Sequence, residues 1–192
     1  MIQKTVLEEI DNVIKETWLN NISKDYAEAY ILKEDSLKSC LYYHMRRRLA
    51  SLLKKHNLRI FTEFDFQELN FRADMVIAKV NPYTEEHLRA SISNEDIIAI
   101  IELKYTCNGS DQTAKWIKHD ISKIKKYLQN IKCQYYFAVI YEVECSVLNW
   151  MDKRSSNNWA SGFVTELNAG YIDGEMQFEI HPYNGLNNQL KS

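Results

Sequence analysis

Five apolar residues in a row, Ile97 to Ile101, stand near the middle of the chain, within the segment DIIAIIELKY at 96–105. An unbroken apolar run of this length is typical of a β-strand that is covered on both of its faces. Such a strand requires a layer of helices or a second sheet on each side. The run therefore predicts a layered fold with residues 96–105 as a central strand.

Further strand patterns lie on both sides of this run. Residues 58–66 and 71–80 are rich in β-forming residues, and only QELN separates them, which predicts an antiparallel hairpin. Residues 81–95 are polar and predict a long connection to the central strand. Three more strands are expected, at 133–143, near 161–167 and near 175–181.

Apolar residues at helical spacing predict four helices. These are expected at 2–17, at 24–34, from an N-cap at Ser36 to about His56, and at 111–131. The last helix joins two buried strands, which predicts a parallel crossover unit. The expected fold class is α/β, with a mixed β-sheet that starts as an antiparallel meander, continues with a parallel crossover strand and is flanked by helices on both faces.

The chain of 192 residues is long enough for one domain with a sizeable core. We expect a core at about 36–143, an N-terminal helical flank at 1–35 and a strand-containing C-terminal extension at 144–192. No stretch approaches the roughly 20 apolar residues that a membrane span needs, and acids interrupt the apolar positions of the N-terminus. A cytoplasmic location without a membrane partner is therefore expected.

Charge is distributed unevenly along the chain. The formal net charge is −2, but residues 36–133 hold seventeen basic and eleven acidic residues, net +6. A polyanion such as DNA can be held by such a region, although solvated helix faces produce the same pattern. The four cysteines have no CxxC spacing, so a zinc site is not expected.

Charged residues follow the central apolar run directly. Glu102 and Lys104 are two residues apart, so they point to one side of the strand, and Asp74 is embedded among the apolar residues of 71–80. Ions at the edge of a core are costly unless they are paired or bind a metal. An ordinary intrastrand ion pair between Glu102 and Lys104 is the simpler interpretation of that pair alone.

Asp74 favours a metal site over a simple ion pair, because opposed side chains on adjacent strands approach within roughly 5 Å. At that distance the carboxylates of Asp74 and Glu102 would repel each other, and a divalent cation would remove this repulsion. Oxygen ligands without His or Cys favour Mg²⁺ or Mn²⁺. Such an ion would polarise a phosphodiester and activate a water, while Lys104 would offset the charge of the transition state.

The order helix, strand, strand with Asp74, strand with Glu102-Leu103-Lys104, helix, strand resembles the PD-(D/E)XK nuclease superfamily, which has the restriction-endonuclease-like fold. The resemblance covers roughly residues 36–143, and Ala73 stands where many members have Pro. It implies that Asp74 and Glu102 bind the metal together with the Leu103 backbone carbonyl, and that Lys104 is the catalytic lysine. Many members add an earlier acid, for which Glu63 is the candidate; a solvent-facing strand residue is the alternative.

Basic residues on the two helices that flank this site are candidates for phosphate contacts, which give affinity without sequence information. For His44 a hydrogen-bonded structural role is the favoured alternative. We also favour a structural role for Asp120, which could pair with Lys123, while Lys123 or His119 could instead lean towards the substrate. The candidate nucleic-acid-binding residues are His44, Arg47, Arg48, Lys118 and Lys123.

These features favour a Mg²⁺- or Mn²⁺-dependent nuclease that hydrolyses DNA rather than RNA, as an endonuclease rather than an exonuclease. A homodimer would be the usual way for a chain of this size to surround a duplex. One alternative is a subunit of the same fold that binds nucleic acid or assembles a complex without turnover. A further alternative is an unrelated α/β interaction protein with a structural Glu102–Lys104 salt bridge.

Overall fold

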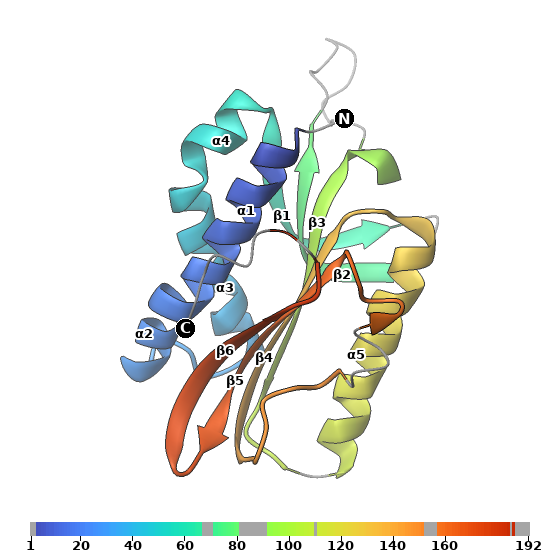
Figure 1. Cartoon of the computed structure of the whole chain (residues 1–192). Coiled ribbons are helices and arrows are strands. Elements are labelled where there is room, and N and C mark those ends of the chain that lie inside the picture. Colours follow the sequence, from blue (N-terminus) through green and yellow to red (C-terminus); the bar gives the residue numbers. More distant parts are fainter. Residues whose placement is uncertain are drawn as a thin grey trace.

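Six β-strands form one sheet whose spatial order follows the chain, from β1 to β6 (Figure 1). The structure, a computed structural model, describes residues 3–66, 71–80, 92–109, 111–151, 157–184 and 186. The strands are β1 (Leu58–Phe66), β2 (Phe71–Lys79), β3 (Ile97–Thr106), β4 (Gln134–Glu144), β5 (Val164–Ile172) and β6 (Glu175–Pro182).

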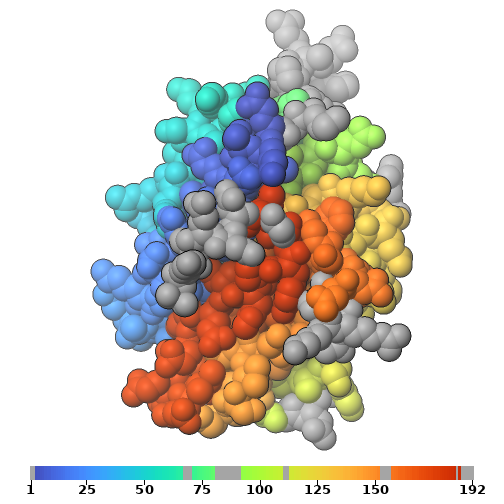
Figure 2. Space-filling view, in the orientation of Figure 1, coloured from blue at the N-terminus to red at the C-terminus, as the bar shows by residue number. Residues whose placement is uncertain are grey.

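Strand directions match the predicted mixed sheet. β1, β2 and β3 form an antiparallel meander, β4 pairs in parallel with β3 and with β5, and β6 returns antiparallel to β5. The expected α/β class, hairpin and parallel crossover are therefore confirmed. β1 and β6 are the two edge strands, and Figure 2 shows β6 (red) at the surface between the helical layers.

Helices cover both faces of the sheet (Figure 1). One face carries the N-terminal helices, and α5 (Asp111–Asn130) covers the other as the crossover between β3 and β4. The N-terminal set consists of α1 (Lys4–Glu16), the π-helical η1 (Thr17–Ile22), α2 (Ser23–Ala27), α3 (Glu34–Arg48) and α4 (Ala50–Lys55). A short 3₁₀ helix, η3 (Asn94–Asp96), leads into β3.

Each face of the sheet has its own apolar core, and β3 contributes to both. Ile101 packs with Leu41 of α3 in the core of the N-terminal helices. Ile100 packs with Ile124 of α5 in the opposite core. Full burial of such side chains stabilises the fold by about 1.5–3 kcal/mol each. The two-sided burial explains why the run at 97–101 is apolar at every position.

The helix expected from Ser36 to His56 is two helices, which corrects that prediction. α3 begins at Glu34, and Ser36 lies inside its first turn, where its Oγ accepts a hydrogen bond from the Lys33 N–H at 3.0 Å. The break falls at Leu49, whose backbone leaves helical geometry while its side chain stays buried. Because Leu52 and Leu53 continue the apolar spacing beyond Leu49, the sequence pattern hides the break.

Two other boundaries also differ from expectation. The N-terminal helix does not end at residue 17 but continues through η1 and α2 to Ala27, so the helix expected at 24–34 is mostly absent. Ala29 has a left-handed φ of 60°, which stops the helix. The strand expected near 161–167 follows a turn at Gly162 (φ 85°) and runs from Val164 to Ile172. Of the connection expected at 81–95, residues 81–91 lie outside the described residues.

Candidate active site

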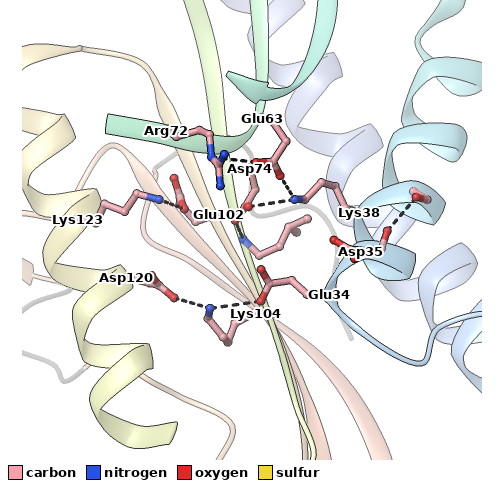
Figure 3. A network of polar contacts seen from close by, with 12 residues as sticks. Glu34, Asp35, Lys38, Glu63, Arg72, Asp74, Glu102, Lys104, Asp120 and Lys123 are labelled. Atoms are coloured by element: carbon pink, nitrogen blue, oxygen red, sulfur yellow. Dashed lines mark hydrogen bonds and ion pairs between the residues drawn. The ribbon is translucent and has the colours of Figure 1, made fainter. Parts of the chain in front are cut away.

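The ladder between β2 and β3 ends at the pair Met75–Ile101. Beyond this pair, in the direction of the connection between β1 and β2, the backbone ladder is replaced by a side-chain contact from Asp74. Its Oδ2 accepts a hydrogen bond from the Leu103 N–H at 2.9 Å (Figure 3). In a strand the N–H and C=O of one residue point to the same neighbour, so the Leu103 carbonyl faces β2 as well.

Asp74 and Glu102 lie on the same face of the sheet. Val76 pairs with Ile100, and each acid is two residues further along its strand towards the end of the ladder. The two side chains are close enough that the charge of Asp74 contributes to the raised pKa of Glu102. Figure 3 shows them between Lys38 on one side and Lys123 on the other.

Glu102 is the buried acid of the site, with 2% of its surface exposed. Its Oε2 accepts a hydrogen bond from the Lys123 Nζ at 2.7 Å, whereas no donor in the described structure is well placed for its buried Oε1, although the Tyr127 hydroxyl interacts with this carboxylate. Burial raises the pKa of Glu102 to about 8, against the lowering effect of Lys123 and with the raising effect of Asp74. A buried oxygen without a well-placed donor is costly, so this atom is poised to accept a cation or a proton.

Lys104 does not pair with Glu102. Its Nζ lies 3.3 Å from Oε2 of Glu34 on α3 and 3.2 Å from Oδ2 of Asp120 on α5. Burial acts to lower the pKa of Lys104, but the charges of Asp120 and Glu34 outweigh it and leave this pKa raised. The ammonium is therefore kept charged at the point where the two helical layers meet around the end of the ladder.

Glu63 lies opposite Asp74, because its neighbours Thr62 and Phe64 pair with Met75 and Ala73. It has a left-handed φ of 52°, a conformation that costs about 1–3 kcal/mol in a residue other than glycine. Its carboxylate binds Lys38 of α3 and, at 2.9 Å, Nε of Arg72.

Lys38 connects Glu63 to the centre of the site. Its Nζ lies 3.3 Å from Asp74 Oδ1 and also contacts Glu63. The hydrogen bond from Lys38 is the largest cause of the lowered pKa of Glu63. The structure thus brings Glu63 beside Asp74 through a shared lysine.

Four residues of this network lay outside the sequence-derived site: Glu34, Lys38, Arg72 and Asp120. Glu34 and Lys38 are four residues apart on α3 and share a helix face, which was a usable signal. Asp120 was expected to pair with Lys123, but Asp120 binds Lys104 while Lys123 binds Glu102.

Three candidate DNA-contacting residues lie elsewhere. His44 Nε2 lies 2.8 Å from Asp25 Oδ2, and Arg48 binds Glu16, so both connect α3 to the N-terminal helices. Arg47 is exposed and contacts Tyr43. α3 meets the site at Lys38, and at 1.5 Å per residue Arg48 is about 15 Å further along. Lys118 is exposed on α5 and Lys123 lies in the site.

The donors present fit a magnesium ion. The described residues hold no group of three or more His, Cys, Asp or Glu side chains placed to bind a metal. Magnesium is commonly held by one or two carboxylates, with water and substrate phosphate completing its shell. Asp74, Oε1 of Glu102 and the Leu103 carbonyl are the oxygens that would supply such a set, with Glu63 as an outer acid.

Comparisons with protein-family models, with curated proteins and with solved structures found no match to this chain. None of the helices in the described residues is both long and apolar enough to span a membrane. The chain's own side chains therefore carry the evidence for its function.

Proposed function

We propose that this chain is a metal-dependent nuclease that hydrolyses DNA phosphodiester bonds at Asp74, Glu102 and Lys104. The observation that carries the proposal is the buried Glu102 carboxylate, one oxygen of which lacks a well-placed hydrogen-bond donor, next to the Asp74 carboxylate at the end of a β-ladder. Two neighbouring carboxylates repel each other when both are ionised, and a divalent cation removes this repulsion. The element order supports a restriction-endonuclease-like fold of the PD-(D/E)XK type.

Mg²⁺ or Mn²⁺, when bound, would supply an activated water and stabilise charge on the phosphate. Asp74 and Glu102 would hold the ion, and the Leu103 N–H keeps the Asp74 carboxylate in one orientation. Lys104, held between Glu34 and Asp120, would position the attacking water and offset the charge that develops on the phosphate oxygens.

Two further lysines neutralise the carboxylates without the ion. Lys38 binds Asp74 and Lys123 binds Glu102, so both ammonium groups must move when a cation takes their place. Each sits on a helix beside the site, where a displaced ammonium would meet the substrate phosphate. Metal binding and substrate binding are therefore expected to support each other.

DNA is the proposed substrate class, bound through phosphate contacts by the basic central region of the chain. α5 also carries exposed lysines, among them Lys115 and Lys118. The proposed enzyme is an endonuclease, which hydrolyses bonds within a strand. It would act in the cytoplasm, as a homodimer that surrounds a duplex.

Cleavage assays on plasmid, linear duplex, single-stranded DNA and RNA, each with Mg²⁺ or Mn²⁺, test this function. We expect cleavage of DNA by the wild type and a loss of at least a hundredfold in Asp74→Asn and Glu102→Gln. Asp65→Asn removes an exposed acid from the same hairpin and is the matched control, with unchanged activity. Wild-type protein that leaves all four substrates intact would contradict the proposal.

A second candidate function is a nucleic-acid-binding or complex-forming subunit without turnover. The pairing of Asp74 with Lys38 and of Glu102 with Lys123 favours it, because these lysines balance the acids without a metal. Calorimetric titration of Mn²⁺ separates the two functions. A nuclease site binds the ion in the wild type and loses it in Asp74→Ala, whereas a retired site binds none.

A further inference from the structure

A groove runs between β1 and the helices α3 and α4. Two adjoining hollows form it, of about 510 and 530 Å³, and they share Tyr42, Ile60 and Phe61 as lining residues. We call this surface the β1 groove. One end is lined by Lys54 and Asn57, and the other by Lys38 and Thr62.

One wall of the β1 groove is a row of residues four apart along the two helices. Lys38, Tyr42, Arg46, Ala50 and Lys54 all line it. Residues at this spacing lie on one side of a helix, so the eight residue steps from Lys38 to Arg46 extend over about 12 Å of α3, and the row continues on α4 beyond the break at Leu49. The groove is therefore elongated, which suits an extended ligand.

The other wall is the edge strand β1, which among the described strands pairs only with β2. Arg59, Ile60 and Phe61 of this strand line the groove. An edge strand presents backbone N–H groups that no neighbouring strand uses. These donors are available to the acceptor oxygens of a ligand that lies along the strand.

The charged residues that line the β1 groove are all positive. Its described lining residues include four cations and no acid; the cations are Lys38, Arg46, Lys54 and Arg59. Arg46, Lys54 and Arg59 are exposed and form no salt bridge with any acid in the described part of the chain. Cations that no acid neutralises are suited to bind phosphates.

A partly exposed aromatic ring also lies among these cations. Tyr42 stands on the helical wall, whereas the Phe61 ring packs with Phe64 against the core on the opposite face of the sheet. The Arg46 guanidinium lies 5.7 Å from the centre of the Tyr42 ring and donates to its hydroxyl at 2.6 Å. An aromatic ring among cations in a groove is a combination that binds single-stranded nucleic acid, through base stacking and phosphate contacts.

We propose that the β1 groove binds a single strand of DNA and leads it to the site at Asp74. Lys38 lines the end of the groove and contacts Asp74, so the strand would arrive at the carboxylates. This destination rests on the proposed nuclease function, whereas the binding itself does not. A duplex and an acidic peptide also fit the charge, but neither presents unpaired bases to the ring of Tyr42.

Fluorescence anisotropy tests the groove without cleavage. The full-length Asp74→Asn protein is titrated, in EDTA, against a labelled oligothymidylate of about 16 nucleotides, its duplex form and a labelled oligoglutamate peptide. The variant pair Arg46→Gln and Arg59→Gln is added, with Lys4→Gln and Lys24→Gln as the matched control. The control removes the same charge from exposed positions of α1 and α2.

We expect the groove pair to weaken oligothymidylate binding at least tenfold and the control pair to change it less than twofold. The slope of log affinity against log salt should fall by about 1.4, or about 0.7 for each phosphate that the protein no longer neutralises. Tyr42→Leu should weaken binding with no change in this slope, because stacking releases no counterions. Thermal unfolding shows that each variant is folded.

Unchanged oligothymidylate binding in the folded groove pair would overturn the proposal. Tighter binding of the oligoglutamate peptide, abolished in the same pair, would also overturn it in favour of a peptide site. Parallel cleavage assays with Mg²⁺ keep the two proposals apart. Groove binding without any cleavage by wild type contradicts only the nuclease, and cleavage that the groove pair leaves unchanged contradicts only the groove.

Discussion

The carboxylate of Asp74 and the backbone N–H of Leu103 are joined by a hydrogen bond of 2.9 Å across the end of the β2–β3 ladder. Leu103 lies between Glu102 and Lys104, so this contact ties one acid of the site to the strand that carries the other two groups. The candidate site is therefore held by two strands rather than by a loop, which favours a fixed geometry.

The Asp74–Leu103 contact predicts different stabilities for two substitutions. Asp74→Asn keeps an oxygen that accepts from the Leu103 N–H, whereas Asp74→Ala leaves this donor without its partner. An unsatisfied buried donor costs about 1–3 kcal/mol. We expect Asp74→Ala to be less stable than Asp74→Asn by about 1–2 kcal/mol in urea unfolding, with metal binding abolished in both. Equal stabilities would show that the hydrogen bond contributes nothing.

Glu102 predicts a pH dependence of stability in the metal-free protein. Burial raises its pKa from 4.5 to about 8, so between these values the folded state holds a proton that the unfolded state releases. The free energy of unfolding therefore falls as pH rises through this window, by up to about 1.4 kcal/mol per pH unit. Glu102→Gln cannot titrate and should lose less stability over the same range.

The measurement is urea unfolding of both proteins in EDTA from pH 5.5 to 8.5. Glu166, with a pKa raised by burial to about 7, acts in the same direction in both proteins and cancels in their difference. The stability of Glu102→Gln relative to wild type should thus increase with pH. Two parallel curves would contradict the raised pKa of Glu102.

Removal of Lys38 should expose the competition between lysine and metal. Lys38→Met leaves Glu63 and Asp74 without their shared cation, and we expect a loss of about 1–2 kcal/mol in metal-free protein, since the lysine is only partly exposed. Mn²⁺ should restore stability and bind more tightly than to wild type. Lys33→Met, which removes an exposed lysine paired with Asp35, is the control and should change neither quantity.

Lys104 is predicted to act in turnover rather than in metal binding. Lys104→Met should lower the DNA cleavage rate by at least a hundredfold, because the charge beside the reacting phosphate is removed. Its Mn²⁺ affinity, measured by calorimetry, should stay within about threefold of wild type. Lys125→Met, at an exposed position of α5, should leave both unchanged. A joint loss of metal affinity and activity would instead assign Lys104 to the metal site.

Arg48 is predicted to be structural, contrary to its expected DNA contact. It binds Glu16 and lies 3.4 Å from the Thr17 hydroxyl, joining α3 to the N-terminal helices. Arg48→Met should lower the free energy of unfolding by about 1 kcal/mol or less, because both partners are partly exposed. DNA affinity at fixed salt should not change. A clear loss of affinity in the folded variant would restore the expected role in DNA binding.

The central part of the fold follows from local patterns. The run Ile97–Ile101 predicts a strand covered on both faces, and the short QELN segment predicts the hairpin before it; both features are present. Side-chain alternation in strands likewise places Asp74 and Glu102 on one face, once β2 and β3 are neighbours. These inferences succeed because periodicity is a property of the chain itself.

The ends of helices were less well predicted where the apolar spacing continues although the helical backbone geometry changes. Leu49 interrupts a helix whose leucine spacing carries on, and η1 extends a helix past residue 17 with Trp18 and Ile22 buried. In both places tertiary packing sets the end of the element. Local propensity is too weak to oppose it.

The sequence alone determined the layers of this protein, the central strand and the acids at its end, because hydrophobic spacing is encoded residue by residue. Only the tertiary structure decided which cation meets which acid: Lys38 and Glu34 reach the site from α3, while His44 and Arg48 on the same helix face the N-terminal helices. Ion pairs leave no periodic pattern in the sequence. Their strength depends on the distance between the charges, and that distance is set by how elements far apart in the chain pack in the folded protein.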